Sequence, residues 1–125
     1  MLSFKQFNIE EGIPIYLQII TYVERGIAAG TIVGGDEMPS RRMLSALIGV
    51  NPNTIQRAYR LLEEEGIIES RSGAKSCVTA DPELAEKIRR QLISRDVKSM
   101  VQGMKQMGIT REEAILQIEA AWEED

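Results

Sequence analysis

Residues 38–79, MPSRRMLSALIGVNPNTIQRAYRLLEEEGIIESRSGAKSCVT, decide the fold of this chain. Ser40 and Asn51 suit the N-cap positions of two short helices, and Pro52 suits the first position of the second helix. Gly49 suits the end of the first helix, because glycine readily adopts the left-handed conformation common there. Apolar residues follow each cap at helical spacing, and they are Leu44, Leu47, Ile48 and then Ile55, Ala58, Tyr59 and Leu62. The stretch therefore predicts two helices joined by a sharp turn.

A small β-hairpin is predicted to follow the second helix. Gly66 ends that helix, and Ile67 and Ile68 begin a short apolar strand. The Ser-Gly pair at 72–73 is a turn signal, and residues 77–79 are β-prone. In a winged helix-turn-helix the second helix reads the major groove of DNA, and such a hairpin contacts phosphates or the minor groove. The predicted fold class is thus mainly α with a small β-hairpin.

Charge is unevenly distributed along the chain. The net charge is −4 at pH 7, yet residues 38–62 contain four arginines and no acidic residue. A positive segment within an acidic protein favours contact with polyphosphate. Residues expected to contact phosphates or the minor groove are Arg41, Arg42, Arg60 and Lys75. Residues expected near base edges, where Asn or Gln reads adenine and Arg reads guanine, are Asn51, Asn53, Thr54, Gln56 and Arg57.

Four phrases in the chain resemble those of the GntR family of bacterial transcription regulators, and the short chain resembles its YtrA-type subgroup. Residues 14–19, PIYLQI, are similar to the opening P-[IL]-Y-x-Q-I, and residues 38–44, MPSRRML, to L-P-S-x-R-x-L. Residues 49–59, GVNPNTIQRAY, resemble G-V-x-x-x-T-V-x-R-A, and residues 62–68, LEEEGII, resemble L-E-x-E-G-L-I. The resemblance covers residues 13–79 by motif and residues 81–123 by length and pattern.

The resemblance implies a winged helix-turn-helix in residues 1–80 and a homodimeric regulator, a repressor, on an inverted-repeat operator in double-stranded DNA. The contact positions that it implies are Ser40, Arg42, Thr54 and Gly73. Two positions depart from the family pattern. Pro52 stands where many members have Arg, and residues 73–78, GAKSCV, replace G-x-G-T-F-V. Larger relatives carry an effector-binding domain after the winged helix, whereas residues 81–125 are too few to enclose a sizeable pocket. A small-molecule effector of unknown identity would therefore bind at the dimer seam or between the two units.

Residues 14–30, PIYLQIITYVERGIAAG, predict a helix that packs against the other two. Its apolar stripe is expected to comprise Tyr16, Ile19, Ile20, Val23 and Ile27. We expect Gly30 to end the helix. No role beyond packing is predicted for this helix.

The C-terminal region, residues 81–125, predicts two further helices, at 82–107 and 111–123. Asp81 and Pro82 form a helix start, Gly108 breaks the stripe, and Thr110 opens a capping box. Two amphipathic helices on so short a tail cannot form a core of their own, so we expect them to bury against a second copy of the chain. The expected dimer interface contains Leu92, Val97, Met100, Val101, Met104, Ile115, Ile118 and Trp122.

Composition argues against enzyme, metal, cofactor and membrane classes. The chain has no histidine and one cysteine, and it contains no P-loop, dinucleotide fingerprint or nucleophile elbow. No catalytic residue, metal site or cofactor is therefore predicted. No apolar run approaches the roughly 20 residues that span a bilayer, and no secretory signal is visible. A lone cysteine fits a reducing cytoplasm.

Simpler interpretations and alternative functions remain beside this one. Cys77 is expected to be a buried strand residue rather than a redox sensor, and the acidic run at 63–65 is expected to be a solvated helix end. A DNA-architectural protein would bind without operator preference, since phosphate contacts carry no sequence code. A protein-docking module would instead present its arginines to an acidic partner.

Overall fold

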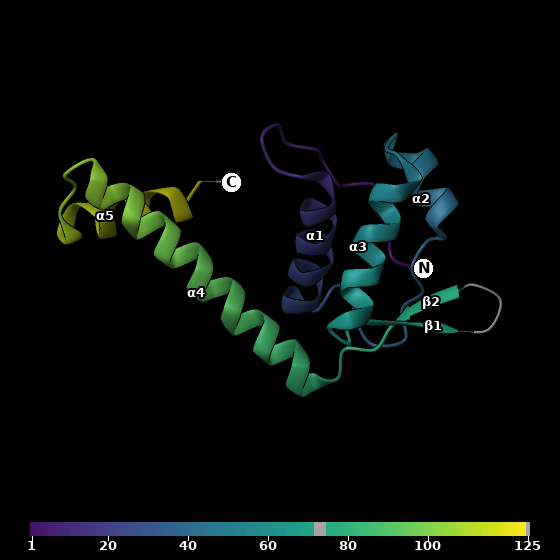
Figure 1. Ribbon diagram of the computed structural model, residues 1–125. Helices are drawn as coiled ribbons and strands as arrows, with labels where there is room; N and C mark the ends of the chain where they lie inside the picture. Colours follow the sequence, from purple (N-terminus) through teal and green to yellow (C-terminus); the bar gives the residue numbers. More distant parts are fainter. Residues whose placement is uncertain (72–74, 125) are drawn as a thin grey trace. The chain divides into compact units, whose positions relative to one another are not determined.

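The computed structural model describes residues 1–71 and 75–124, which form five helices and one two-stranded antiparallel hairpin (Figure 1). The elements in chain order are α1 (Ile15–Ala29), α2 (Arg41–Ile48), α3 (Pro52–Glu64), β1 (Ile68–Arg71), β2 (Lys75–Val78), α4 (Pro82–Gln106) and α5 (Arg111–Trp122). This order confirms the predicted fold class, mainly α with a small hairpin in a winged helix-turn-helix.

The chain divides into two compact units, residues 1–90 and the residues from Gln91 onward. The division falls inside α4, so the boundary predicted between residues 80 and 81 does not coincide with it. The division into a DNA-binding region, residues 1–80, and a dimerisation region, residues 81–125, stays a prediction.

The turn between α2 and α3 is built by the residues that predicted it. The Ser40 hydroxyl accepts a hydrogen bond from the Met43 amide at 3.0 Å, and the Asn51 side-chain oxygen accepts one from the Asn53 amide at 2.7 Å. Gly49 ends α2 with a φ of 68°, which is the left-handed region that favours glycine. Local capping chemistry therefore determines where both helices begin and where α2 ends.

The core of the first unit lies between α1, α2 and α3. Ile19 and Val23 of α1 and Ile55 of α3 are fully buried, and α1 and α2 each pack against α3. Within α2, Leu44 is completely buried but Leu47 is 58% exposed. The predicted apolar stripe of α2 is thus only partly buried, because α2 packs mainly against the single helix α3.

The hairpin is continued by a chain segment that precedes α2. Ile68 of β1 lies opposite Val78 of β2, and Arg71 lies opposite Lys75. On the other side of β2, the Val78 amide donates to the Asp36 carbonyl and the Met38 amide donates to the Ser76 carbonyl, each at 2.8 Å. The segment that leads into α2 is therefore joined to the base of the hairpin.

The N-terminal arm, residues 1–13, is fastened to α1. Phe4 stacks on Tyr22 of α1 with ring centroids 4.8 Å apart, and Phe7 meets the same ring edge-on at 5.4 Å. The Gln18 side chain accepts a hydrogen bond from the Glu10 amide at 2.8 Å and donates to the Glu10 carbonyl at 2.9 Å. No sequence pattern predicted this packing of the arm.

The second unit contains most of α4 and all of α5. The two predicted caps are present: within the first unit the Asp81 carboxylate accepts from the Leu84 amide at 2.8 Å at the start of α4, and within the second unit the Thr110 hydroxyl accepts from the Glu113 amide at 3.2 Å. No residue of α5 is buried, and Trp122 is 81% exposed. Among the described residues, no helix has both the length and the apolar character needed to cross a membrane.

Candidate nucleic-acid interface

The polar residues of α3 lie on its outer face. Its apolar stripe is buried against the core, which leaves the polar positions toward solvent. Thr54 is half-buried, and the exposed candidates on or beside this helix are Asn51, Asn53, Gln56, Arg57 and Arg60. The side-chain oxygen of Asn51 already serves as a helix cap, so its amide nitrogen is the group left to donate to a phosphate or a base. The helix thus presents donors and acceptors of the kind that read base edges.

Arg57 is held in place by a residue of another helix. Its guanidinium carbon lies 3.9 Å from the centroid of the Tyr16 ring in α1, which is a close cation–π contact. The sequence predicted a packing role only for α1, so this contribution was missed. The available signal was an aromatic residue at the start of α1, but spacing along the chain could not pair it with Arg57.

Arg41 is turned toward the protein itself. Its Nη2 atom lies 3.2 Å from Glu63 Oε1, and its guanidinium lies over the Tyr59 ring at 5.0 Å. Glu63 is also half-buried, and its carboxylate accepts a hydrogen bond from the Ser70 hydroxyl at 2.9 Å. The acidic run at 63–65 is therefore not simply a solvated helix end, since Glu63 has two partners inside the fold.

The remaining predicted cations are exposed and loosely paired. Within the described part of the chain Arg42 has no ion-pair partner. Arg60 lies 3.9 Å from Glu64, and Lys75 lies 3.9 Å from Glu37. Exposed pairs of this kind contribute at most about 1 kcal/mol. Such side chains can exchange an intramolecular carboxylate for a DNA phosphate at little cost.

Ser40 and Gly73 were also predicted to contact DNA, and the structure describes only the first of them. Ser40 is exposed at the start of α2, and its hydroxyl, which accepts from the Met43 amide, can still donate its proton to an anion. Gly73 lies outside the described residues. Lys75 and Arg71 stand opposite each other in the hairpin register, and Arg71 Nη2 lies 2.9 Å from Glu69 Oε1.

Tyr59 supports the interface from inside. Its hydroxyl donates to the Pro39 carbonyl at 2.6 Å, which links α3 to the segment just before α2. Burial raises the pKa of this hydroxyl well above its ordinary value, and the Arg41 charge lowers it only in part. The phenol is therefore neutral at physiological pH and acts as a hydrogen-bond donor.

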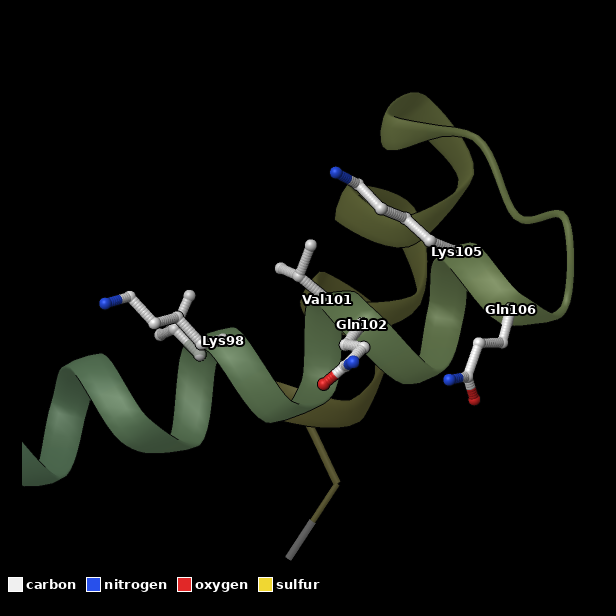
Figure 2. Close-up of a pocket in the computed structure, with 6 residues that line it drawn as sticks. Lys98, Val101, Gln102, Lys105 and Gln106 are labelled. Carbon is white, nitrogen blue, oxygen red and sulfur yellow. The ribbon is translucent and has the colours of Figure 1, made fainter.

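An open groove lies along α4 in the second unit. Its volume is about 620 Å³, and Figure 2 shows the side chains on the helix. The lining residues are Val97, Lys98, Val101, Gln102, Lys105 and Gln106. Two of the predicted dimer residues, Val97 and Val101, thus form an exposed apolar strip beside lysine and glutamine. Within residues 1–71 and 75–124, no cluster of three or more His, Cys, Asp or Glu could hold a metal ion.

The family model described as "Bacterial regulatory proteins, gntR family" matches residues 15–78. That match spans α1, the helix-turn-helix and the hairpin. It therefore covers every element that carries a candidate DNA-contacting residue.

Two proteins of Bacillus subtilis (strain 168) are similar in sequence over most of the chain. The HTH-type transcriptional regulator YhcF is 34% identical over 102 residues, which cover 82% of this chain and 84% of YhcF. The HTH-type transcriptional repressor YtrA is 32% identical over 114 residues, which cover 91% of this chain and 83% of YtrA.

A solved structure agrees with these sequence relatives. A GntR family transcriptional regulator from Listeria monocytogenes aligns with a TM-score of 0.80 and 33% identity, over 90% of this chain and 98% of that one. The similarity therefore extends over both compact units and not only over the helix-turn-helix.

Proposed function

The chain belongs to the GntR family of bacterial regulatory proteins, and from that premise we propose that it is a homodimeric repressor that binds an inverted-repeat DNA operator. At the level of the family it is a transcription regulator with a DNA-binding winged helix-turn-helix, not an enzyme. The name of the relative YtrA describes a repressor. That name supports the same direction of control for this chain.

One observation carries the proposal: the outer face of α3 presents Asn, Gln and Arg side chains while its inner face is locked into the core. Ile55 and Leu62 are completely buried, so the helix has a single orientation relative to α1 and α2. Arg57, stacked on Tyr16, is therefore presented in a defined direction. A rigid helix with a fixed set of donors is what direct readout of a major groove requires.

The contacts divide into two kinds under this proposal. Asn53, Gln56 and Arg57 would meet base edges, and Thr54 would lie at the border of the groove. Exposed cations would meet phosphates, and they are Arg42, Arg60, Arg71 and Lys75. Phosphate contacts position the protein and make its affinity fall as salt rises, while base contacts specify the sequence.

The second unit supports the proposed dimer. Leu92 is buried and Met104 and Ile118 are half-buried, whereas Val97, Met100, Val101, Ile115 and Trp122 are exposed large apolar residues on α4 and α5. Isolated exposed apolar residues are ordinary, but so many on two neighbouring helices support a surface that another chain covers. A two-fold dimer would place two reading helices in symmetric half-sites, which is why an inverted repeat is proposed.

The function is tested by selecting bound duplexes from a random DNA pool and titrating the selected duplex with salt. An enriched inverted repeat, bound more weakly at higher salt, is expected. Salt-sensitive binding without an enriched motif would instead indicate an architectural protein. Absence of bound DNA at every salt concentration would contradict a DNA-binding function altogether.

The dimer is tested separately by sedimentation of a Val101→Glu variant. A charge in the apolar strip of α4 is expected to shift the protein toward monomer, because burying an unpaired carboxylate is costly. Ser99→Glu adds the same single negative charge at an exposed position of α4 outside the groove lining, so it is the control for a change of charge alone. A dimer equally tight in both variants would contradict the proposed interface.

A further inference from the structure

The Glu63 carboxylate is a junction between three elements of the first unit. Glu63 lies in the last turn of α3, and its Oε1 atom is 3.2 Å from Nη2 of Arg41 at the start of α2. The same oxygen accepts a hydrogen bond from the hydroxyl of Ser70 in β1 at 2.9 Å. One carboxylate oxygen therefore connects the reading helix to the preceding helix and to the hairpin.

This junction is better protected from solvent than the other ion pairs. The Arg41 and Glu63 side chains are 29% and 32% exposed, whereas those of Arg60 and Glu64 are 59% and 61% exposed. Reduced exposure lowers screening by water and salt, so the contact holds its geometry better. Arg41 Nε is buried without a hydrogen-bond partner in the described part of the chain. Glu63 is therefore the main polar partner that keeps the Arg41 guanidinium in place.

We infer that Glu63 is a positioning residue for DNA binding, which sets the direction of the hairpin relative to α3. The inference rests on the proposed function. In the hairpin, Ser70 is followed by Arg71, which faces Lys75 across the two strands. Holding Ser70 against the end of α3 aims these two cations at the backbone of the duplex whose groove α3 occupies.

The direction in which DNA affinity changes on removal of the Glu63 carboxylate distinguishes a positioning role from simple charge repulsion. A carboxylate near DNA repels phosphate, so its removal alone should leave affinity unchanged or strengthen it. A positioning role predicts the opposite, because the hairpin cations would lose their orientation. Glu65 is the matched control, since it lies two residues away, is exposed, and has no ion pair within the described residues.

The experiment compares the operator affinity of the full-length wild type, Glu63→Ala and Glu65→Ala over a series of salt concentrations. Glu63→Ala is expected to bind roughly three- to tenfold more weakly, and its salt slope is expected to fall by about 1 as a hairpin phosphate contact is lost. Glu65→Ala is expected to bind as tightly as wild type or slightly more tightly. Equal or tighter binding by Glu63→Ala would overturn the inference and mean that Glu63 only withholds Arg41 from DNA.

Two further variants keep the test valid if Glu63→Ala is poorly folded. Ser70→Ala removes only the hydrogen bond between the hairpin and Glu63, at an exposed position. We expect its operator affinity to fall less than that of Glu63→Ala, with a reduced salt slope. Glu63→Gln keeps a carbonyl oxygen for Ser70 and is expected to restore part of the affinity. Wild-type affinity and salt slope in Ser70→Ala would overturn the inference. A wild-type protein that binds no duplex would instead overturn the proposed function.

Discussion

The guanidinium of Arg57 stacks on the ring of Tyr16, with the guanidinium carbon 3.9 Å from the ring centroid. Tyr16 belongs to α1 and Arg57 to α3, so a helix outside the helix-turn-helix orients a side chain on the reading helix. A flexible arginine loses side-chain entropy when it binds DNA, and prior stacking reduces that loss.

Replacement of Tyr16 by Leu is expected to weaken operator binding by about two- to fivefold, which corresponds to the value of an exposed cation–π contact. Tyr16→Phe retains the ring and is expected to bind like wild type. Fluorescence anisotropy with labelled operator measures both. Equal losses in the two variants would mean that the hydroxyl, and not the ring, is the important group.

The two adjacent arginines at the start of α2 are expected to behave differently. Arg42→Ala should weaken binding to all duplexes and reduce the salt slope by about 1, with little change in stability, because Arg42 is exposed and unpaired within the described chain. Arg41→Ala should lower the free energy of unfolding by about 1–2 kcal/mol, since it leaves the half-buried Glu63 carboxylate without its cation. Salt titrations and denaturant unfolding of both variants decide whether this division holds.

Thr54→Ala is expected to change selectivity more than overall affinity. Thr54 is half-buried near the start of α3, and its side chain carries both a hydroxyl and a methyl group, either of which can meet a base edge. Competition between operators that differ by single base pairs measures the change, with an expected shift of about 1 kcal/mol or more at one position per half-site. A uniform loss across all the operators would place Thr54 against phosphate instead.

Tyr59→Phe is expected to lower the free energy of unfolding by about 1 kcal/mol, because the Pro39 carbonyl loses its donor. The pKa of Tyr59 is raised in the folded state, so its contribution is complete below the unfolded-state value near 10 and is lost as pH rises above it. The stability difference between the wild type and Tyr59→Phe should therefore shrink above about pH 10. Denaturant unfolding from pH 7 to 11 tests the sign, and a constant difference would contradict it.

Gly26→Ala is expected to destabilise the protein, although alanine normally favours a helix. A Cβ atom at this position would lie 2.6 Å from Ile32 Cγ1 and would also clash with Ile32 Cδ1, and Ile32 is buried. Overpacking of this kind costs about 1–3 kcal/mol, which exceeds the gain of roughly 1 kcal/mol in helix propensity. Gly103→Ala in α4 is the control, since nothing described lies within 4 Å of its Cβ, and thermal melting compares the two at one protein concentration.

Caps and turns were predictable because their causes lie within a few residues. Ser40, Asn51, Asp81 and Thr110 each cap a helix through an amide two or three positions away. Gly49 has the positive φ expected of a residue that ends a helix. The resemblance to the family rested on the same local phrases, which is why fold class and family could both be inferred without a structure.

Side-chain pairing could not be inferred in the same way. Arg41 was predicted to face DNA because it is a cation beside other cations, but the partner that holds it, Glu63, is 22 residues away in the chain. Leu47 belongs to an apolar stripe by its spacing, but α2 packs mainly against one helix and leaves it exposed. The N-terminal arm carried no periodic signal, and its two phenylalanine rings pack against each other and against Tyr22 of α1.

The sequence by itself determined the element order, the helix caps, the winged helix-turn-helix and the family, because hydrogen bonds to nearby amides and apolar periodicity act over short separations. Only the tertiary structure decided which cations are free and which are held. Arg42 is exposed and unpaired within the described residues, Arg41 is paired with Glu63, and Arg57 is stacked on Tyr16. Those differences arise from contacts between helices that are distant in the chain, and composition contains no information about which residues the fold brings together.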